Sequence, residues 1–169
     1  RREYEEAETL LNKAIAGHPK YPYAHYFMGI LRGLQERHAD AAASFLRAIE
    51  LDPHNRQAHH NFGIALFKGG RPKEAAEALQ QAINLLDDAE SRHVRGQALA
   101  TAGKFDEALS EIRKSIELDP KQANAHADLG KILLHVGKKS EAEASLKRAL
   151  ELDPNHAEAK ANLRKSQER

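Results

Sequence analysis

AAASFLRAIELDP, residues 41–53, decides the fold, because four variants of it occur elsewhere in the chain. They are AETLLNKAIAGHP at 7–19, AAEALQQAINLLD at 75–87, ALSEIRKSIELDP at 108–120 and AEASLKRALELDP at 142–154. The first residues of the five stretches are 34, 34, 33 and 34 residues apart. A fixed period of this length is typical of stacked-repeat proteins, in which each unit packs on its neighbours. The period therefore predicts a solenoid of roughly four and a half repeats.

The composition narrows the range of partners. The 169 residues include 26 Lys and Arg, 25 Asp and Glu, and no Cys, for a formal net charge of +1. Because the two charge signs are interleaved, we expect no nucleic-acid partner. No apolar run approaches the ~20 residues of a membrane-spanning helix, so no membrane insertion is expected. The absence of Cys excludes disulfides and Cys-based zinc sites, but leaves the cellular compartment open.

Apolar residues recur at helical spacing and predict two helices in each repeat. The expected helices cover about 1–17, 22–36, 39 or 40–51, 56–69, 73–85, 89–102, 106–118, 123–136, 140–152 and 157–168. Pro22 and Pro72 suit the first position of a helix, and Pro53 ends the helix before it. Asp106 and Ser140 are expected N-caps. Glycines that can stop a helix in the left-handed conformation are Gly69-Gly70, Gly103 and Gly137.

Two positions in each repeat are nearly always small. The first helices carry Gly29, Gly63, Gly96 and Gly130, at what we call the glycine position. The second helices carry a recurring alanine followed by a larger residue, namely Ala41 and Phe45, Ala75 and Leu79, Ala108 and Ile112, and Ala142 and Leu146. A glycine within a helix costs about 1 kcal/mol relative to alanine. Four glycines at equivalent positions therefore predict close contact between the two helices of each repeat.

These positions resemble the tetratricopeptide repeat family, whose unit is a 34-residue helix–turn–helix. The matching residues are Phe62-Gly63, Ala75, Leu79, Ala82, Gly96, Ala108, Ile112, Ser115 and Pro120. The resemblance implies an all-α fold, a right-handed α-solenoid of antiparallel helix pairs, in a single array. The expected units are the second helix of a truncated repeat (1–21), repeats at 22–55, 56–88, 89–122 and 123–156, and a capping helix (157–169). Since the chain begins within a helix, we expect it to be part of a longer protein.

The resemblance also implies a function. In this family the first helices line a concave groove that binds peptides, so we expect a non-catalytic scaffold that binds a peptide or helical segment of a partner protein. The expected groove residues are Tyr23, Tyr26, Ile30, His60, Asn61, Ile64, Phe67, His93, Gln97 and Lys131. The alternative for Tyr26, Ile30, Ile64 and Phe67 is that they belong to the core. Alternative functions are self-association through the open N-terminal end, as a dimer or fibre, and a regulatory arm of a larger enzyme.

Two binding devices of the family are absent or partial. A clamp of Lys and Asn for a C-terminal carboxylate is not present, since only Asn61 fits it and Tyr26, Ile30, Glu90 and Val94 occupy the other places. A ladder of Asn residues is interrupted, and its positions hold Phe27, Asn61, Val94, Asp128 and Asn162. Asp128 is expected to be a solvated surface acid.

Ten histidines raise the possibility of a metal site. His25, His59 and His126 are equivalent and are expected to be half-buried packing residues with a polar tip. His60 and His93 are expected in a wet groove. Because no carboxylate or Cys accompanies them at ligand spacing, we expect no metal and no cofactor.

The sequence shows no catalytic motif, and its acids recur with the repeat as surface charges, so no enzyme activity is expected. One position is irregular, because Arg95 stands where the other first helices carry an apolar residue. We expect Arg95 to reach Asp87, Asp88 or solvent. The alternative is that Arg92 and Arg95 form a basic spot for an acidic partner segment.

Overall fold

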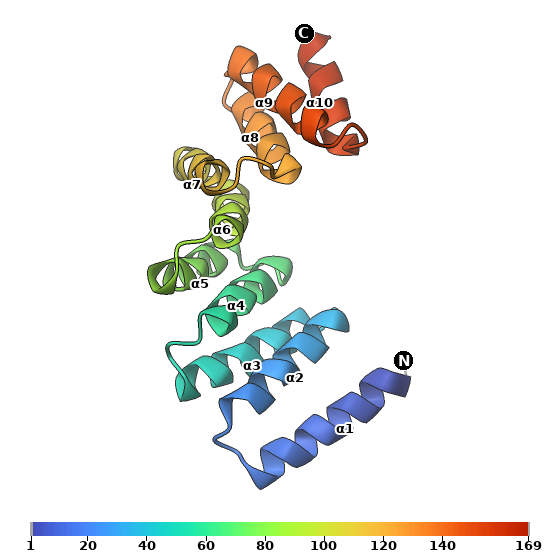
Figure 1. The fold of residues 1–169 in the computed structure, drawn as a ribbon, viewed down its shortest axis with the longest axis vertical. Helices are drawn as coiled ribbons and strands as arrows, with labels where there is room; N and C mark the ends of the chain where they lie inside the picture. Colours follow the sequence, from blue (N-terminus) through green and yellow to red (C-terminus); the bar gives the residue numbers. More distant parts are fainter. Residues whose placement is uncertain (1, 169) are drawn as a thin grey trace. The chain divides into compact units, whose positions relative to one another are not determined.

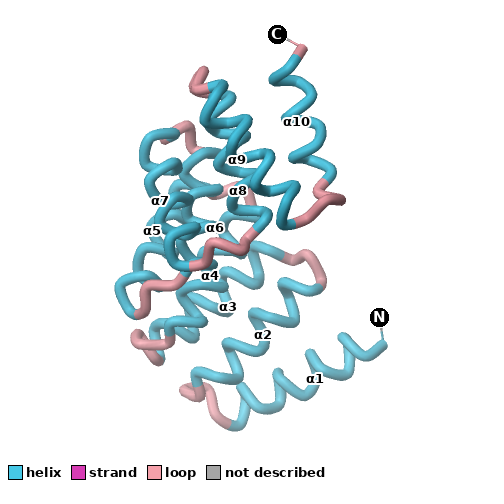
Figure 2. Tube along the Cα trace, turned by 45° about the horizontal axis from the view of Figure 1, so that its top comes forward, coloured by secondary structure: helices cyan, strands magenta, loops and turns pink. Residues whose placement is uncertain are grey.

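The structure is a computed structural model that describes residues 2–168, and within them it contains ten α-helices and no strand (Figures 1 and 2). The helices are α1 (Arg2–Gly17), α2 (Pro22–Leu34), α3 (His38–Leu51), α4 (Arg56–Lys68), α5 (Pro72–Leu85), α6 (Ala89–Thr101), α7 (Phe105–Leu118), α8 (Ala123–His135), α9 (Lys139–Leu152) and α10 (Ala157–Gln167).

The helices form two compact units. Unit 1 is Arg1–Asp87 and unit 2 is Asp88–Arg169. In unit 1, α2 packs on α3 and α4 packs on α5, while α3 joins the two pairs and α1 lies against α2. In unit 2, α6 packs on α7 and α8 on α9, while α10 contacts both α8 and α9. Each predicted pair of helices is therefore a packed pair in the structure.

The predicted helix starts and stops are largely confirmed. Pro22 and Pro72 are the first residues of α2 and α5. α3 ends at Leu51, and Asp52 before Pro53 leaves the helical region with φ −139° and ψ 86°. Three glycines that follow first helices have positive φ, namely Gly70 (77°), Gly103 (80°) and Gly137 (79°).

The predicted N-caps at Asp106 and Ser140 are wrong. Lys104 and Lys138 occupy the N-cap positions of α7 and α9, and neither makes a side-chain capping bond. The chain leaves each positive-φ glycine and enters the next helix two residues later. Asp106 therefore already lies in the first turn of α7, where its negative charge interacts favourably with the helix dipole.

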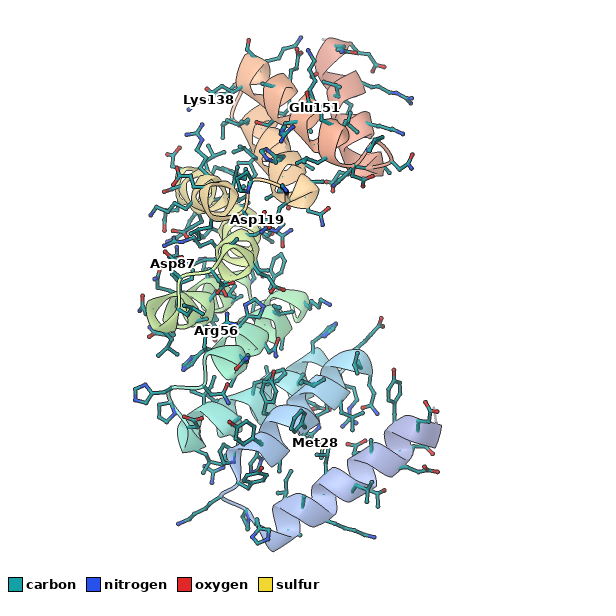
Figure 3. All side chains as sticks on the ribbon, in the orientation of Figure 1. Met28, Arg56, Asp87, Asp119, Lys138 and Glu151 are labelled. Carbon is teal, nitrogen blue, oxygen red and sulfur yellow. The ribbon has the colours of Figure 1, made fainter. Side chains whose placement is uncertain are left out.

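Close contact at the glycine position is confirmed in all four helix pairs. A Cβ atom added to Gly29 would lie 2.7 Å from the ring of Phe45, a distance that real Cβ contacts do not reach. The corresponding distances are 2.5 Å from Gly63 to Leu79, 2.5 Å from Gly96 to Ile112 and 2.6 Å from Gly130 to Leu146. The four recurring alanines on the second helices are fully buried. Met28, beside Gly29 on α2, is also buried (Figure 3).

Three equivalent histidines fasten the turns between repeats. The Nε2 atoms of His25, His59 and His126 lie 2.9, 3.0 and 3.1 Å from the backbone carbonyl oxygens of Pro19, Pro53 and Pro120. A carbonyl oxygen can only accept a hydrogen bond, so Nε2 carries the proton in each of these histidines. The three rings are half-buried, which confirms the predicted packing role with a polar tip.

The glycine contact predicts opposite effects for two substitutions in α2. Gly29→Ala should destabilise unit 1 by about 1 kcal/mol, because overpacking against Phe45 outweighs the gain in helix propensity. Gly33→Ala meets no atom within 4 Å and should stabilise by up to about 1 kcal/mol. Urea denaturation followed by circular dichroism measures both. Stabilisation by both variants would contradict the packing role of Gly29.

Glu36 is the non-glycine residue with positive φ, at 60°, in the described part of the chain. It occupies the turn position that Gly70, Gly103 and Gly137 hold in the later repeats. Glu36→Gly should raise the thermal midpoint by relieving about 0.5–1 kcal/mol of backbone strain, after allowance for the more flexible unfolded chain. Gly70→Ala is the reciprocal control and should lower the midpoint. If neither substitution changed the thermal midpoint, the positive φ at these turn positions would have no effect on stability.

Candidate functional site

An exposed apolar stripe runs along α2 in unit 1. It consists of Tyr23, Phe27, Ile30 and Leu34, which we call the α2 stripe and which lie four, three and four residues apart on one helix face. Tyr23, Phe27 and Leu34 are 47%, 50% and 62% exposed, and Ile30 is half-buried. Apolar side chains gathered on one exposed face are typical of an interaction surface.

Tyr26 connects the stripe to α4. The Nδ2 atom of Asn61 donates a hydrogen bond to the hydroxyl of Tyr26 at 3.1 Å. The Tyr26 ring also packs on Phe27 and Phe45, with ring centroids 5.5 and 5.8 Å apart. The structure therefore brings two predicted groove residues together, and it uses Tyr26 both to hold α2 on α4 and to support Phe27.

The other predicted residues of α4 are partly or fully covered. Ile64 and Phe67 are half-buried. His60 is only 8% exposed, so the prediction that it lies in a wet groove is wrong. His60 lies three positions before the buried Gly63 and therefore on the packed side of α4.

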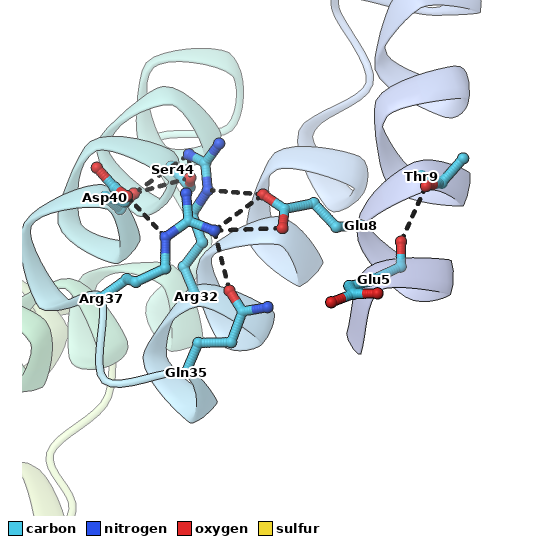
Figure 4. Close-up of polar contacts among 8 residues, drawn as sticks. All are labelled: Glu5, Glu8, Thr9, Arg32, Gln35, Arg37, Asp40 and Ser44. Carbon is cyan, nitrogen blue, oxygen red and sulfur yellow. Dashed lines mark hydrogen bonds and ion pairs between the residues drawn. The ribbon is translucent and has the colours of Figure 1, made fainter. Parts of the chain in front are cut away.

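A polar cluster holds α1 against α2 and α3 in unit 1 (Figure 4). Nη1 of Arg37 lies 3.1 and 3.2 Å from the two carboxylate oxygens of Glu8, and Nε of Arg37 lies 2.9 Å from Asp40. The hydrogen bonds to Asp40 and then to Glu8 raise the pKa of Arg37. Arg32 donates to the buried Ser44 hydroxyl at 2.7 Å. These bonds tie α1 to the pair formed by α2 and α3.

In unit 2 the predicted groove residues converge on Asp128 of α8. Nε2 of His93 lies 2.8 Å from Oδ2 of Asp128, and Nε2 of Gln97 donates to the same oxygen at 2.7 Å. The side chain of Asp128 is 16% exposed and that of His93 is 12% exposed. The predictions of a solvated acid and of a histidine in a wet groove are therefore wrong. Both residues face a neighbouring first helix, which supplies the partner.

The environment of Asp128 favours its charged form. Burial is the largest single influence and opposes ionisation, but the hydrogen bonds from His93 and Gln97, with the charges of His93 and Lys131, outweigh it and lower the pKa of Asp128. Lys131 in turn pairs with Glu158 of α10 at 2.7 Å. The hydrogen bond to Glu158 outweighs a smaller effect of burial and raises the pKa of Lys131. Polar contacts thus connect α6, α8 and α10.

Arg92 and Arg95 pair with the same buried acid, which was not among the predicted residues. Their Nη1 atoms lie 2.8 and 2.7 Å from the two carboxylate oxygens of Glu111 on α7, which is 7% exposed. A charged residue at a packing position needs such a partner. Because both guanidinium groups face the packed interior between α6 and α7, this arrangement does not support a basic spot for a partner.

Phe27, Asp128 and Glu158 belong to these surfaces but were not among the predicted groove residues. One signal could have found the bonds between first helices. Tyr26 and Asn61 are 35 residues apart, as are His93 and Asp128, so one repeat plus one residue is the spacing at which neighbouring first helices meet.

Among residues 2–168 no group of three His, Cys, Asp or Glu side chains could hold a metal ion. Over the same residues, every helix is too short or too polar to cross a membrane.

The repeats match models of a known protein family. Two profiles described as Tetratricopeptide repeat match the chain, one over residues 1–55 and 28–91 and the other over residues 99–165. The chain belongs to the tetratricopeptide repeat family. Its fold class is the one predicted, an all-α right-handed α-solenoid of antiparallel helix pairs. The general role that this fold supports is a scaffold for protein–protein interaction.

Individual proteins resemble the chain over different lengths. The crystal structure of YrrB, described as "a TPR protein with an unusual peptide-binding site", matches with a TM-score of 0.85 and 29% identity, covering 95% of this chain and 83% of that one. Anaphase-promoting complex subunit 3 of Schizosaccharomyces pombe is 28% identical over 131 residues, 77% of this chain. DnaJ homolog subfamily C member 3 of Gallus gallus is 34% identical over 82 residues, 48% of this chain. The chain spans 20% and 16% of the lengths of these two relatives.

The bonds around Asp128 predict a pH-dependent contribution to stability. Asp128→Asn should destabilise unit 2 by about 1–2 kcal/mol at pH 7, because hydrogen bonds to a charged group are lost or weakened. The folded-state pKa of Asp128 is lowered, so this stabilisation is complete above the unfolded pKa of about 3.9 and disappears as the pH falls through the folded value.

Thermal denaturation between pH 7 and pH 3 measures the effect. The difference between wild type and Asp128→Asn should shrink below about pH 4. Glu117→Gln, on the exposed surface of α7, is the control and should change stability by less than about 0.5 kcal/mol at pH 7. A constant difference across the range would contradict the ionised role of Asp128.

Proposed function

We propose that this chain is a non-catalytic scaffold that binds a peptide or helical segment of a partner protein on the surfaces formed by its first helices. The observation that carries the proposal is the α2 stripe, in which three large apolar side chains are about half exposed or more on one face of one helix. A helix or extended peptide with apolar residues at matching spacing would cover them.

Unit 1 would supply the apolar anchors. Tyr23 and Ile30 belong to the α2 stripe, and Tyr26 lies beside it with its hydroxyl bonded to Asn61. Ile64 and Phe67 on α4 keep part of their surface exposed and would extend the contact. His60 is buried in α4 and would support these apolar residues from the packed side of the helix. Aromatic and aliphatic anchors with polar neighbours are typical of peptide-binding surfaces.

Unit 2, taken by itself, would offer polar contacts to a partner. His93, Gln97 and Lys131 are each bonded to an acid of a neighbouring helix, so their side chains are held in fixed positions. Such preorganised groups can contact the polar backbone of a partner without losing further side-chain freedom. The similarity to YrrB, itself described as having a peptide-binding site, adds support from a relative of comparable length.

A selection from a peptide-display library, followed by fluorescence anisotropy with the selected peptides, tests the proposal. Phe27→Ser/Leu34→Ser should weaken binding at least tenfold and shift the thermal midpoint little, because both side chains are at least half exposed. Ile64→Ser/Phe67→Ser should lower both affinity and stability, since these residues are half-buried.

Leu46→Ser is the matched control. Leu46 is 44% exposed and belongs to the second helix α3 of the same unit. It should leave the affinity unchanged. Equal binding by wild type and by the Phe27→Ser/Leu34→Ser variant would reject the α2 stripe as the binding surface.

A further inference from the structure

His156 makes a hydrogen bond with each nitrogen of its ring at the start of α10. Its Nδ1 atom accepts from the backbone N–H of Ala159 at 3.3 Å. Its Nε2 atom lies 3.0 Å from Oδ1 of Asn124, in the first turn of α8. A backbone N–H can only donate, so Nδ1 carries no proton and Nε2 donates to Asn124. The two bonds together require the neutral ring with its proton on Nε2.

Equivalent positions show that the bond to Nδ1 is an N-cap. The N-caps of the first helices α4 and α6 are Asn55 and Asp88, and each accepts from the backbone N–H three residues later, at 3.0 and 2.9 Å. His156 makes the same bond for α10, with a ring nitrogen in place of an oxygen. Histidine gains a proton between about pH 8 and pH 5, and a protonated Nδ1 can no longer accept. Acid therefore removes the cap and places a positive charge at the positive end of the α10 dipole.

Few side chains of α10 are buried. Ala159 and Ser166 are buried and Leu163 is half-buried. Ala159 and Leu163 belong to an apolar cluster whose members on α8 and α9 are Ala127, Leu134, Leu146, Ala149 and Leu150. The Nδ2 atom of Asn162 is buried without a hydrogen-bond partner, and Ala127, which lies 35 residues earlier, has no polar side-chain atom to accept from it. A buried donor without an acceptor opposes packing, so the docked position of α10 is sensitive to the loss of its cap.

We propose that His156 is an acid-sensitive latch for α10. In its neutral form the ring holds α10 on α8 and α9, and when the ring gains a proton α10 detaches from them. Detachment exposes the apolar residues that pack against Ala159 and Leu163, including Leu134 and Leu150. The latch goes beyond the proposed function and does not depend on it, since the α2 stripe lies in unit 1.

The charged groups near the start of α10 do not change over the same pH range. They are Lys121, Asp128 and Lys131 on or before α8, Glu151 and Asp153 at the end of α9, and Glu158 and Lys160 on α10. Lys, Asp and Glu side chains ordinarily keep their charges between pH 7.5 and pH 5.5. The pair of Lys131 with Glu158 therefore holds α10 equally at both ends of this range.

The other histidines of unit 2 keep their contacts when they are protonated. His93 and His126 bond through Nε2 to acceptor oxygens, and an imidazolium still donates from that atom. The ring of His135 lies on that of Phe105, with centroids 4.3 Å apart, and a positive charge favours contact with an aromatic ring. Acid should therefore release α10 and leave α6, α7, α8 and α9 packed.

Amide hydrogen exchange of the full chain, followed by NMR at pH 7.5 and pH 5.5 and corrected for intrinsic rates, tests the latch. Protection of the α10 amides should fall at least about fivefold at pH 5.5, the effect of losing a typical N-cap. Protection in α8 and α9 should fall less than twofold. Nitrogen-15 shifts should show the Nε2–H tautomer of His156 at pH 7.5. Unchanged protection of α10, an equal loss in all three helices, or the Nδ1–H tautomer would each overturn the proposal.

Three substitutions separate the titration of His156 from other effects of acid. His156→Asn keeps an N-cap that does not titrate, as Asn55 does for α4, so protection of α10 should be nearly equal at the two pH values. His156→Ala removes the cap and should leave α10 weakly protected at both. His135→Gln changes an exposed histidine of α8 and is the matched control, which should retain the wild-type response. A wild-type response in His156→Asn, or its loss in His135→Gln, would overturn the role of His156.

Discussion

The structure depends on the contact between a glycine on each first helix and a large side chain on the second helix of the same repeat. Phe45, Leu79, Ile112 and Leu146 approach their glycines so closely that no Cβ atom fits between the helices. Dispersion and burial at this contact outweigh the loss of helix propensity at glycine. Each contact joins two helices that follow one another in the sequence and are connected by a short turn. Every repeat therefore has its own packing constraint.

Because this packing constraint is local to each repeat, the sequence predicts the helices and their pairing well. Periodicity, proline and glycine identify the helices and their pairing, and the hydrogen bonds of His25, His59 and His126 follow from their equivalent places. The contacts between neighbouring first helices are harder to predict, because each needs a particular residue on two helices. Asp128 is polar in the sequence and resembles a surface acid, yet His93 and Gln97 make it a half-buried acceptor. Glu111 was missed for the same reason, since its partners Arg92 and Arg95 lie on another helix.

The two units differ in what their first helices offer to a partner. In unit 1, α2 exposes large apolar side chains on one of its faces. In unit 2, polar side chains of α6, α8 and α10 satisfy one another through Asp128 and the pair of Lys131 with Glu158. Asn162 departs from this pattern, because Ala127 stands at the place of its partner. A single repeat framework thus carries an exposed apolar surface in one unit and polar contacts between its helices in the other.

The bonds from histidine to proline carbonyl have a spectroscopic consequence. Nε2 of each ring must keep its hydrogen as long as the turn is intact, so the imidazole tautomer reports on whether that turn is folded. Nitrogen-15 chemical shifts of His25 and His59 would follow unit 1, and those of His126 would follow unit 2. In repeat proteins, whose parts can open separately, the chain therefore contains natural probes of local opening that require no added label.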